Sequence, residues 1–142
     1  YTIHSNLFSK VIELNDIKKL YQFFDLKASL YWDTHYVFGS SSKKRIKKTS
    51  SSFADLLIIN VILPIRYAYA KYHNKNETNV LEELIGAIKP EKNRIIEMYK
   101  VMGVSVDSAL GSQGLLELKS NYCDKKRCLS CSIGLQLMQT KK

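Results

Sequence analysis

The segment FADLLIINVILPIRYAYAKY, from Phe53 to Tyr72, most constrains what this chain can fold into. Its apolar side chains continue around the whole circumference of a helix, and helices of that kind are normally covered by neighbours. Asp55, Asn60, Pro64 and Arg66 interrupt it, whereas a membrane-spanning helix needs about 20 mainly apolar residues without such charges. The segment is therefore predicted to be the buried central helix of a soluble protein, with no membrane as partner.

Pro64 lies in the second half of this segment. Proline has no N–H, so the carbonyl group of Asn60 loses its donor, and the helix is expected to bend there. Ser51 or Ser52 can cap the start of the helix. A kinked core helix is the plain interpretation, and a functional role for Asn60 or Arg66 is the alternative.

Other segments have the same helical period. They are NDIKKLYQFFD with Asn15 as N-cap, TNVLEELIGAIK after Thr78, PEKNRIIEMYKVMG from Pro90 to Gly103, VDSALGSQGLLELKSNYC, and a last helix that begins near Cys128. Runs of alternating β-branched residues are absent. The prediction is an all-α fold, a multi-helix bundle around a buried central helix kinked at Pro64, with residues 1–142 as one helical domain.

Three stretches together carry a resemblance to a known family: YWDTHYVFG (Tyr31 to Gly39), IINVILP (Ile58 to Pro64) and YCDKKRCLSCSIG (Tyr122 to Gly134). They resemble the C-terminal part of the bacterial proteins called domain of unknown function 2851, and the cysteine stretch is the most specific of the three. Family members are longer, so the resemblance implies that the chain is a C-terminal fragment whose partner is the missing N-terminal part of the same protein. In GSQGLLELKS, Gly111 and Gly114 depart from the family pattern and question the continuity of that helix.

All three cysteines lie within nine residues, with the spacing C-x4-C-x2-C. This spacing places the last two one helical turn apart at a helix start, with the first folding back from the preceding turn. Zinc and iron–sulfur sites normally take four protein ligands. The candidate ligands are Cys123, Cys128 and Cys131, completed by His4, His35, His73 or a residue outside this chain.

Three interpretations of the cysteines remain open: a zinc or iron–sulfur site, packed free thiols beside a helix start, and a disulfide. Thiol exchange by the CLSC motif has less support, because that motif normally lies on a βαβ scaffold and none is visible. Cysteine is scarce and odd in number, which favours a reducing compartment and predicts a cytoplasmic location. His35 lies on an aromatic-rich stretch, next to Tyr36 and near Trp32, and is expected to be a hydrogen-bonded core or boundary histidine.

The chain has a formal net charge of +9, and its basic residues are unevenly distributed. The stretch SSSKKRIKKTSSS, residues 40–52, contains no acidic residue and is predicted to be a flexible basic surface loop. Flexible cations of this kind suit phosphate contact through counterion release. The candidate nucleic-acid-binding residues are Lys43, Lys44, Arg45, Lys47, Lys48, Lys125, Lys126 and Arg127. A solvated loop that keeps the protein soluble is the alternative, and an anionic membrane surface is a third.

Two function classes follow from these patterns. The first is an uncharacterised helical structural or interaction domain of a longer bacterial protein. The alternative is a nucleic-acid-associated module that uses the basic loop and the cysteine-rich turn, with or without a bound metal. Paired carboxylates, a phosphate-cradling glycine loop and an H-E-x-x-H pattern are all absent, so the chain shows no catalytic set and whether it is an enzyme stays open.

Overall fold

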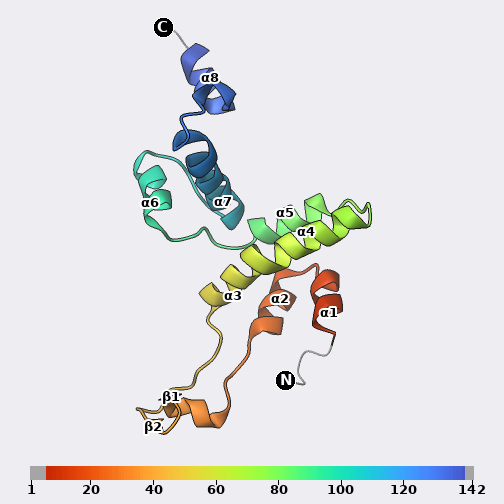
Figure 1. Ribbon diagram of the computed structural model, residues 1–142, viewed down its shortest axis with the longest axis vertical. Helices are drawn as coiled ribbons and strands as arrows, with labels where there is room; N and C mark the ends of the chain where they lie inside the picture. The colour runs from red at the N-terminus through yellow and green to blue at the C-terminus, as the bar shows by residue number, and fades with distance from the viewer. Residues whose placement is uncertain (1–5, 140–142) are drawn as a thin grey trace. The chain divides into compact units, whose positions relative to one another are not determined.

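Helices make up most of the chain in the computed structural model, which describes residues 6–139 (Figure 1). The mainly helical fold is therefore confirmed. Contacts within the chain divide it into two compact units, Tyr1–Leu84 and Ile85–Lys142. The single helical domain over residues 1–142 stays a prediction.

The first unit contains most of the elements along the chain. Their order is α1 (Leu7–Glu13), α2 (Ile17–Phe24), the 3₁₀ turn η1 (Leu30–Asp33), β1 (His35–Val37), β2 (Ser40–Ser41), α3 (Ser51–Leu57), the π-helical turn η2 (Ile58–Ile62), α4 (Leu63–Tyr72) and α5 (Thr78–Gly86), which crosses into the second unit. β1 and β2 pair antiparallel and form a small sheet within the mainly helical fold. The strands are too short to leave an alternating pattern in the sequence.

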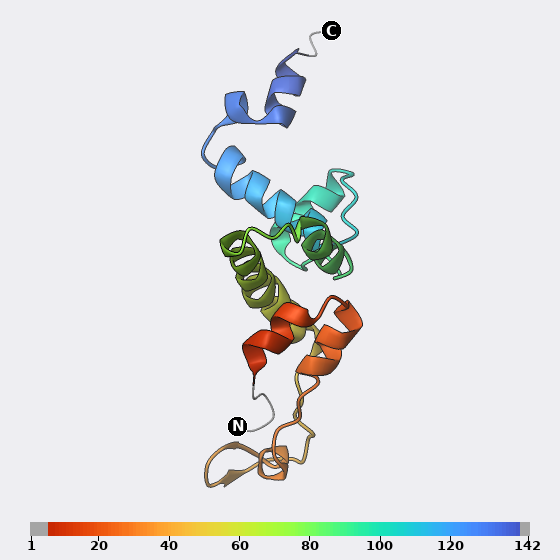
Figure 2. The same ribbon diagram turned by 90° about the vertical axis from the view of Figure 1, so that its right-hand side faces the viewer.

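The helical run Ser51–Tyr72 buries one face only. Its buried residues recur about every fourth position, at Ala54, Ile58, Ile62, Leu63, Arg66 and Ala70. Phe53, Val61 and Tyr67 on the remaining surface are exposed. The prediction that neighbours cover this helix all round is therefore wrong. Figure 2 shows α1 and α2 beside the run.

Pro64 is preceded by the π-helical turn, where the N–H of Leu63 donates to the carbonyl oxygen of Ile58, five residues back. The amide of Asn60 donates to the carbonyl oxygen of Leu56 at 2.9 Å. The kink at Pro64 stays a prediction. By length and composition alone, Ser51–Tyr72 could cross a membrane, but the core helix of a soluble protein passes the same test, so this evidence is weak.

Two helix caps lie one residue from their predicted positions. Asp16, not Asn15, caps α2, and its carboxylate accepts a hydrogen bond from the N–H of Lys18 at 2.8 Å. Ser50, not Ser51 or Ser52, caps α3. The side-chain oxygen of Asn15 instead accepts a hydrogen bond from the guanidinium of Arg66 at 2.6 Å.

The second unit holds the cysteines. Its further elements are α6 (Arg94–Val101), α7 (Ala109–Glu117), the π-helical turn η3 (Leu118–Cys123), the 3₁₀ turn η4 (Cys128–Ser130) and α8 (Ser132–Gln139). The α6 helix begins at Arg94 after the Asn93 cap, so the predicted start at Pro90 is wrong. The N–H of Ala109 donates to the carbonyl oxygen of Ile88 at 2.8 Å, which joins α7 to the loop after α5. Gly111 and Gly114 lie inside α7 without interrupting it.

Candidate nucleic-acid interface

Residues 26–49 form a long hairpin between α2 and α3, which we call the aromatic–basic hairpin (Figure 1). Backbone hydrogen bonds join its two sides at several levels. The N–H of Ala28 donates to the carbonyl oxygen of Lys47 at 2.9 Å, and the N–H of Arg45 donates to that of Asp33 at 2.7 Å. The predicted basic loop, residues 40–52, is therefore held by its backbone at residues 41–49, while its flexibility remains untested.

Aromatic rings gather at the end of the hairpin. The ring of Tyr31 stacks on His35 with centroids 4.1 Å apart and an interplanar angle of 5°. Phe38 lies edge-on to Trp32 at 5.0 Å and is itself 81% exposed. Gly39 makes the turn between the strands with φ of 75°, in the left-handed region that favours glycine. The rings of the cluster contact one another, and Phe38 stays largely exposed to solvent.

His35 is a half-buried boundary residue, as predicted. Its ring Nδ1 lies 2.9 Å from the carbonyl oxygen of Tyr31 and 3.0 Å from Oγ1 of Thr34. These contacts orient the imidazole within the aromatic cluster. These contacts indicate a structural role for His35.

Lys47 differs from the other cations of the hairpin because it has partners within the protein. Its Nζ donates to the carbonyl oxygen of His35 and lies 3.5 Å from the centroid of the Tyr36 ring. A cation over a tyrosine face is attracted by the negative potential of the ring. Lys47 therefore closes the hairpin rather than offering its charge freely to a ligand.

The remaining cations of the loop are exposed and unpaired. The side chains of Lys43, Lys44, Arg45 and Lys48 form no hydrogen bond or ion pair with residues 6–139. The one acidic residue of the hairpin, Asp33, is buried at 7% exposure. The hairpin thus presents positive charge beside exposed aromatic rings without an exposed carboxylate of its own.

The cysteine stretch forms the turn between α7 and α8. Cys123 ends η3 and Cys128 begins η4, both exposed, whereas Cys131 is buried, and all three are free thiols. Within residues 6–139, no three His, Cys, Asp or Glu side chains come together as a metal site, and His4 lies outside that range. Metal binding stays a prediction.

The turn is closely packed at Gly134, in the first turn of α8. A Cβ atom built there would lie 2.5 Å from the carbonyl oxygen of Cys128, closer than real Cβ atoms approach. The N–H of Cys131 donates to the same oxygen at 3.2 Å. These contacts support the interpretation of the cysteine stretch as a packed turn before the last helix.

Tyr99 of α6 connects that helix to Cys123. Burial raises the pKa of the Tyr99 hydroxyl, and its charge interaction and hydrogen bond with Cys123 act in the same direction.

The three cations of the turn have different surroundings. Lys125 donates to the side-chain oxygen of Asn121. Lys126 has φ of 53°, in the left-handed region, and neither its side chain nor that of Arg127 is paired with residues 6–139. The sequence alone did not single out Asn121 and Tyr122, which lie beside Arg127 in an open pocket.

The aromatic members of the hairpin were also not predicted as site residues. Their signal is visible in retrospect, because the aromatic-rich stretch YWDTHYVFG directly precedes the basic run. Alternation of rings and cations is typical of surfaces that bind single-stranded nucleic acid. The sequence did not show that the aromatic-rich stretch and the basic run fold back on each other.

Comparison with known proteins yields one match. The family model for the protein of unknown function (DUF2851) matches residues 1–94, which include the aromatic–basic hairpin and the central helix but not the cysteine stretch. No curated protein and no solved structure matches the chain. The match covers more than half of the sequence, and the chain belongs to the DUF2851 family of proteins of unknown function.

Proposed function

We propose that this chain is a nucleic-acid-binding module and that the aromatic–basic hairpin is its contact surface for single-stranded nucleic acid. One observation carries the proposal: exposed rings and unpaired cations share one backbone-paired hairpin whose only carboxylate is buried. Phosphates attract the cations through counterion release, and unstacked bases can lie on the rings.

Single strands fit this surface better than duplexes. Phe38 is 81% exposed, so its ring offers area to a base, and Tyr36 is 63% exposed although Lys47 lies over one face of its ring. Bases in a duplex are already stacked, and their faces are closed to side chains. A duplex would therefore use only the cations, whereas a single strand uses both kinds of group.

The first test is the salt dependence of binding to a single-stranded oligonucleotide, measured by fluorescence anisotropy. Replacing Lys43, Lys44, Arg45 and Lys48 together with Gln should flatten the log–log salt slope by about three units, because each neutralised phosphate of a single strand contributes about 0.7. Lys47 is kept, since it closes the hairpin.

The matched control neutralises four exposed cations elsewhere, Lys18, Lys19, Lys89 and Lys92. It removes the same charge, so a slope change as large as that of the hairpin variant would show that only net charge matters. Phe38→Ala tests the rings. It should weaken single-strand binding by about 1 to 3 kcal/mol, the usual contribution of one stacked base, while leaving the salt slope unchanged.

A second candidate function is an interaction domain, and an apolar groove in the first unit favours it. This groove, of about 290 Å³, is lined by Leu7, Phe8, Val11, Phe24, Leu57, Val61, Ile62 and Ile65. If the wild-type chain binds neither DNA nor RNA at low salt, the nucleic-acid proposal fails and the interaction domain becomes the better account.

A further inference from the structure

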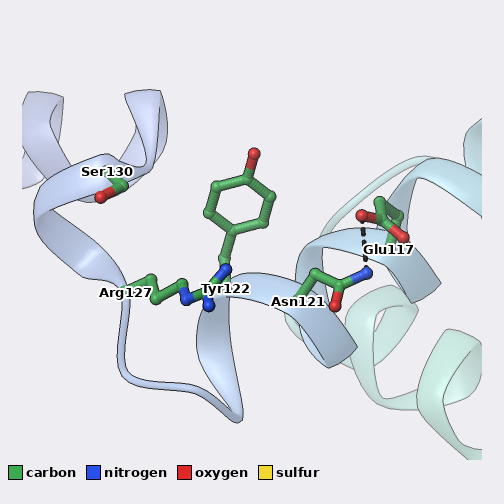
Figure 3. A pocket seen from close by; sticks show the side chains of 5 residues that line it. All are labelled: Glu117, Asn121, Tyr122, Arg127 and Ser130. Carbon is green, nitrogen blue, oxygen red and sulfur yellow. Dashed lines mark hydrogen bonds between the residues drawn. The ribbon is translucent and has the colours of Figure 1, made fainter.

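A polar pocket of about 390 Å³ opens beside the cysteine turn in the second unit (Figure 3). Its lining consists of Glu117 at the end of α7, Asn121 and Tyr122 in η3, and Arg127 and Ser130 in the turn that follows. The volume is in the lower part of the range of about 300–1,000 Å³ that small-molecule sites occupy. None of these residues belongs to the aromatic–basic hairpin.

The backbone around the pocket is irregular at two places. The π-helical turn η3 carries Asn121 and Tyr122, and Lys126, directly before Arg127, adopts a left-handed conformation with φ of 53°. Single π turns and non-glycine residues in this region cost free energy and recur at functional sites. Here Asn121 and Tyr122 lie within the first irregularity and Arg127 directly follows the second.

Arg127 is the cation that this geometry leaves available. Its backbone is fixed, since its N–H donates to the carbonyl oxygen of Tyr122 at 2.8 Å and its own carbonyl oxygen accepts from Ser130 at 3.1 Å. Its guanidinium has no hydrogen-bond or ion-pair partner among residues 6–139. By contrast, Lys119 pairs with Asp124, and the hydrogen bond between them raises the pKa of Lys119.

The lining groups are arranged by chemical kind. In Figure 3, Ser130 lies on one side of the Tyr122 ring and Glu117 on the other, and the guanidinium of Arg127 lies next to the base of the Tyr122 side chain. The carboxylate of Glu117 accepts from the amide of Asn121 at 2.7 Å. A guanidinium fork and a hydroxyl suit a phosphate group, a phenol ring offers a flat face, and a carboxylate accepts from a ligand donor.

We propose that this pocket binds a nucleoside monophosphate, with the phosphate at Arg127 and Ser130, the base against the ring of Tyr122, and a hydroxyl or amine donating to Glu117. The inference goes beyond the proposed function, because pocket and hairpin lie in different compact units and neither proposal requires the other.

Isothermal titration calorimetry of the whole chain with AMP tests the proposal. Adenosine, ribose 5-phosphate and inorganic phosphate are titrated in parallel, and each should bind at least tenfold more weakly than AMP because each lacks part of the contact set. Arg127→Ala should weaken AMP binding about ten- to hundredfold, the usual loss for hydrogen bonds to a charged group. Arg127→Lys keeps the positive charge but lacks the paired N–H donors of the guanidinium. Its affinity for AMP should therefore lie between those of the wild type and of Arg127→Ala.

Arg94→Ala is the matched control, because Arg94 is an exposed cation of the same unit that does not line the pocket. An equal loss of AMP binding in this control would overturn the proposal. So would inorganic phosphate binding as tightly as AMP, or no AMP binding at millimolar concentration. The variant with Gln at the four hairpin cations should bind AMP as the wild type does. Loss of AMP binding in this variant would show that the nucleotide lies on the hairpin, and the pocket proposal would fail.

Discussion

Arg66 is a charged side chain buried to 1% exposure in α4. Its guanidinium donates to the carbonyl oxygen of Leu14 at 2.5 Å, to the side-chain oxygen of Asn15 at 2.6 Å and to the carboxylate of Glu77 at 3.1 Å. These partners come from the α1–α2 connection and the residue before α5. One side chain therefore ties three segments of the first unit together, with its Nε left unpartnered.

Replacing Arg66 with Met should lower the free energy of unfolding by about 3 kcal/mol, the lower end of the range for breaking a buried ion pair, since Glu77 keeps some contact with solvent. Arg66→Lys should be less damaging, because an ammonium keeps the charge but cannot reach all three acceptors. Urea unfolding at neutral pH measures both. Arg94→Met, at an exposed position, should stay within about 0.5 kcal/mol of the wild type.

Tyr21 of α2 donates from its hydroxyl to the carboxylate of Asp55 in α3. Burial raises the pKa of Tyr21, and the hydrogen bond and charge of Asp55 raise it further. A tyrosine of the unfolded chain ionises near pH 10, so the unfolded state loses its proton first. The resulting stability is fully present below about pH 10 and is lost as pH rises above it toward the folded pKa.

Tyr21→Phe should cost about 1 kcal/mol of stability at pH 7, the usual net value of one hydrogen bond. The difference in free energy of unfolding between wild type and variant should narrow above pH 10, because only the wild type loses the contribution of the Tyr21 hydroxyl. Urea unfolding at pH 7 and at pH 10.5 measures the gap. Tyr72→Phe, whose hydroxyl has no hydrogen-bond partner in the described part of the chain, should show no gap at pH 7. A gap for Tyr21→Phe that widens with pH would contradict the assignment.

At the scale of elements, α7 and α8 contain glycines in opposite situations. Gly114 lies inside α7 with nothing within 4 Å of an added Cβ atom, whereas a Cβ atom at Gly134 would meet the carbonyl oxygen of Cys128. A glycine in an open helix interior costs roughly 0.5 to 1 kcal/mol relative to alanine. Where another part of the backbone lies as close as it does at Gly134, alanine cannot replace glycine without a clash.

Gly114→Ala should therefore stabilise the protein by about 0.5 to 1 kcal/mol. Gly134→Ala should destabilise it by roughly 1 to 3 kcal/mol, as overpacking usually does, because the backbone of Cys128 has to move. Thermal unfolding measures the two shifts, and hydrogen exchange over residues 128–139 locates the second. Equal shifts in the same direction would show that the turn at Cys128 is not closely packed.

At the scale of the whole molecule, the segment that matches the family nearly coincides with the first compact unit. Residues 1–94 include the entire first unit, with the hairpin and the central helix, and the start of the second. The net charge of +9 gives any anionic partner a favourable long-range field. The unpaired cations of the hairpin concentrate part of that charge in the matched region.

Helix positions could be predicted from the sequence because a helix is specified locally, by apolar periodicity and caps. Asn15 and Asp16 show the limit of that reasoning. Both residues are good N-caps, but Asp16 caps α2, while the side-chain oxygen of Asn15 accepts a hydrogen bond from Arg66, fifty-one residues along the chain. The cysteine turn was located correctly as the entry to the last helix, but its close packing depends on backbone geometry at Gly134.

The sequence by itself determined that the chain is mainly helical, where most helices lie, and that basic residues concentrate at residues 43–48. Tertiary structure decided which face of Ser51–Tyr72 is buried, since the apolar residues of that helix surround it and do not favour one side. It also decided that the aromatic stretch and the basic run lie on one hairpin. That pairing depends on backbone hydrogen bonds such as that from Ala28 to Lys47, which carry no side-chain signature in the sequence.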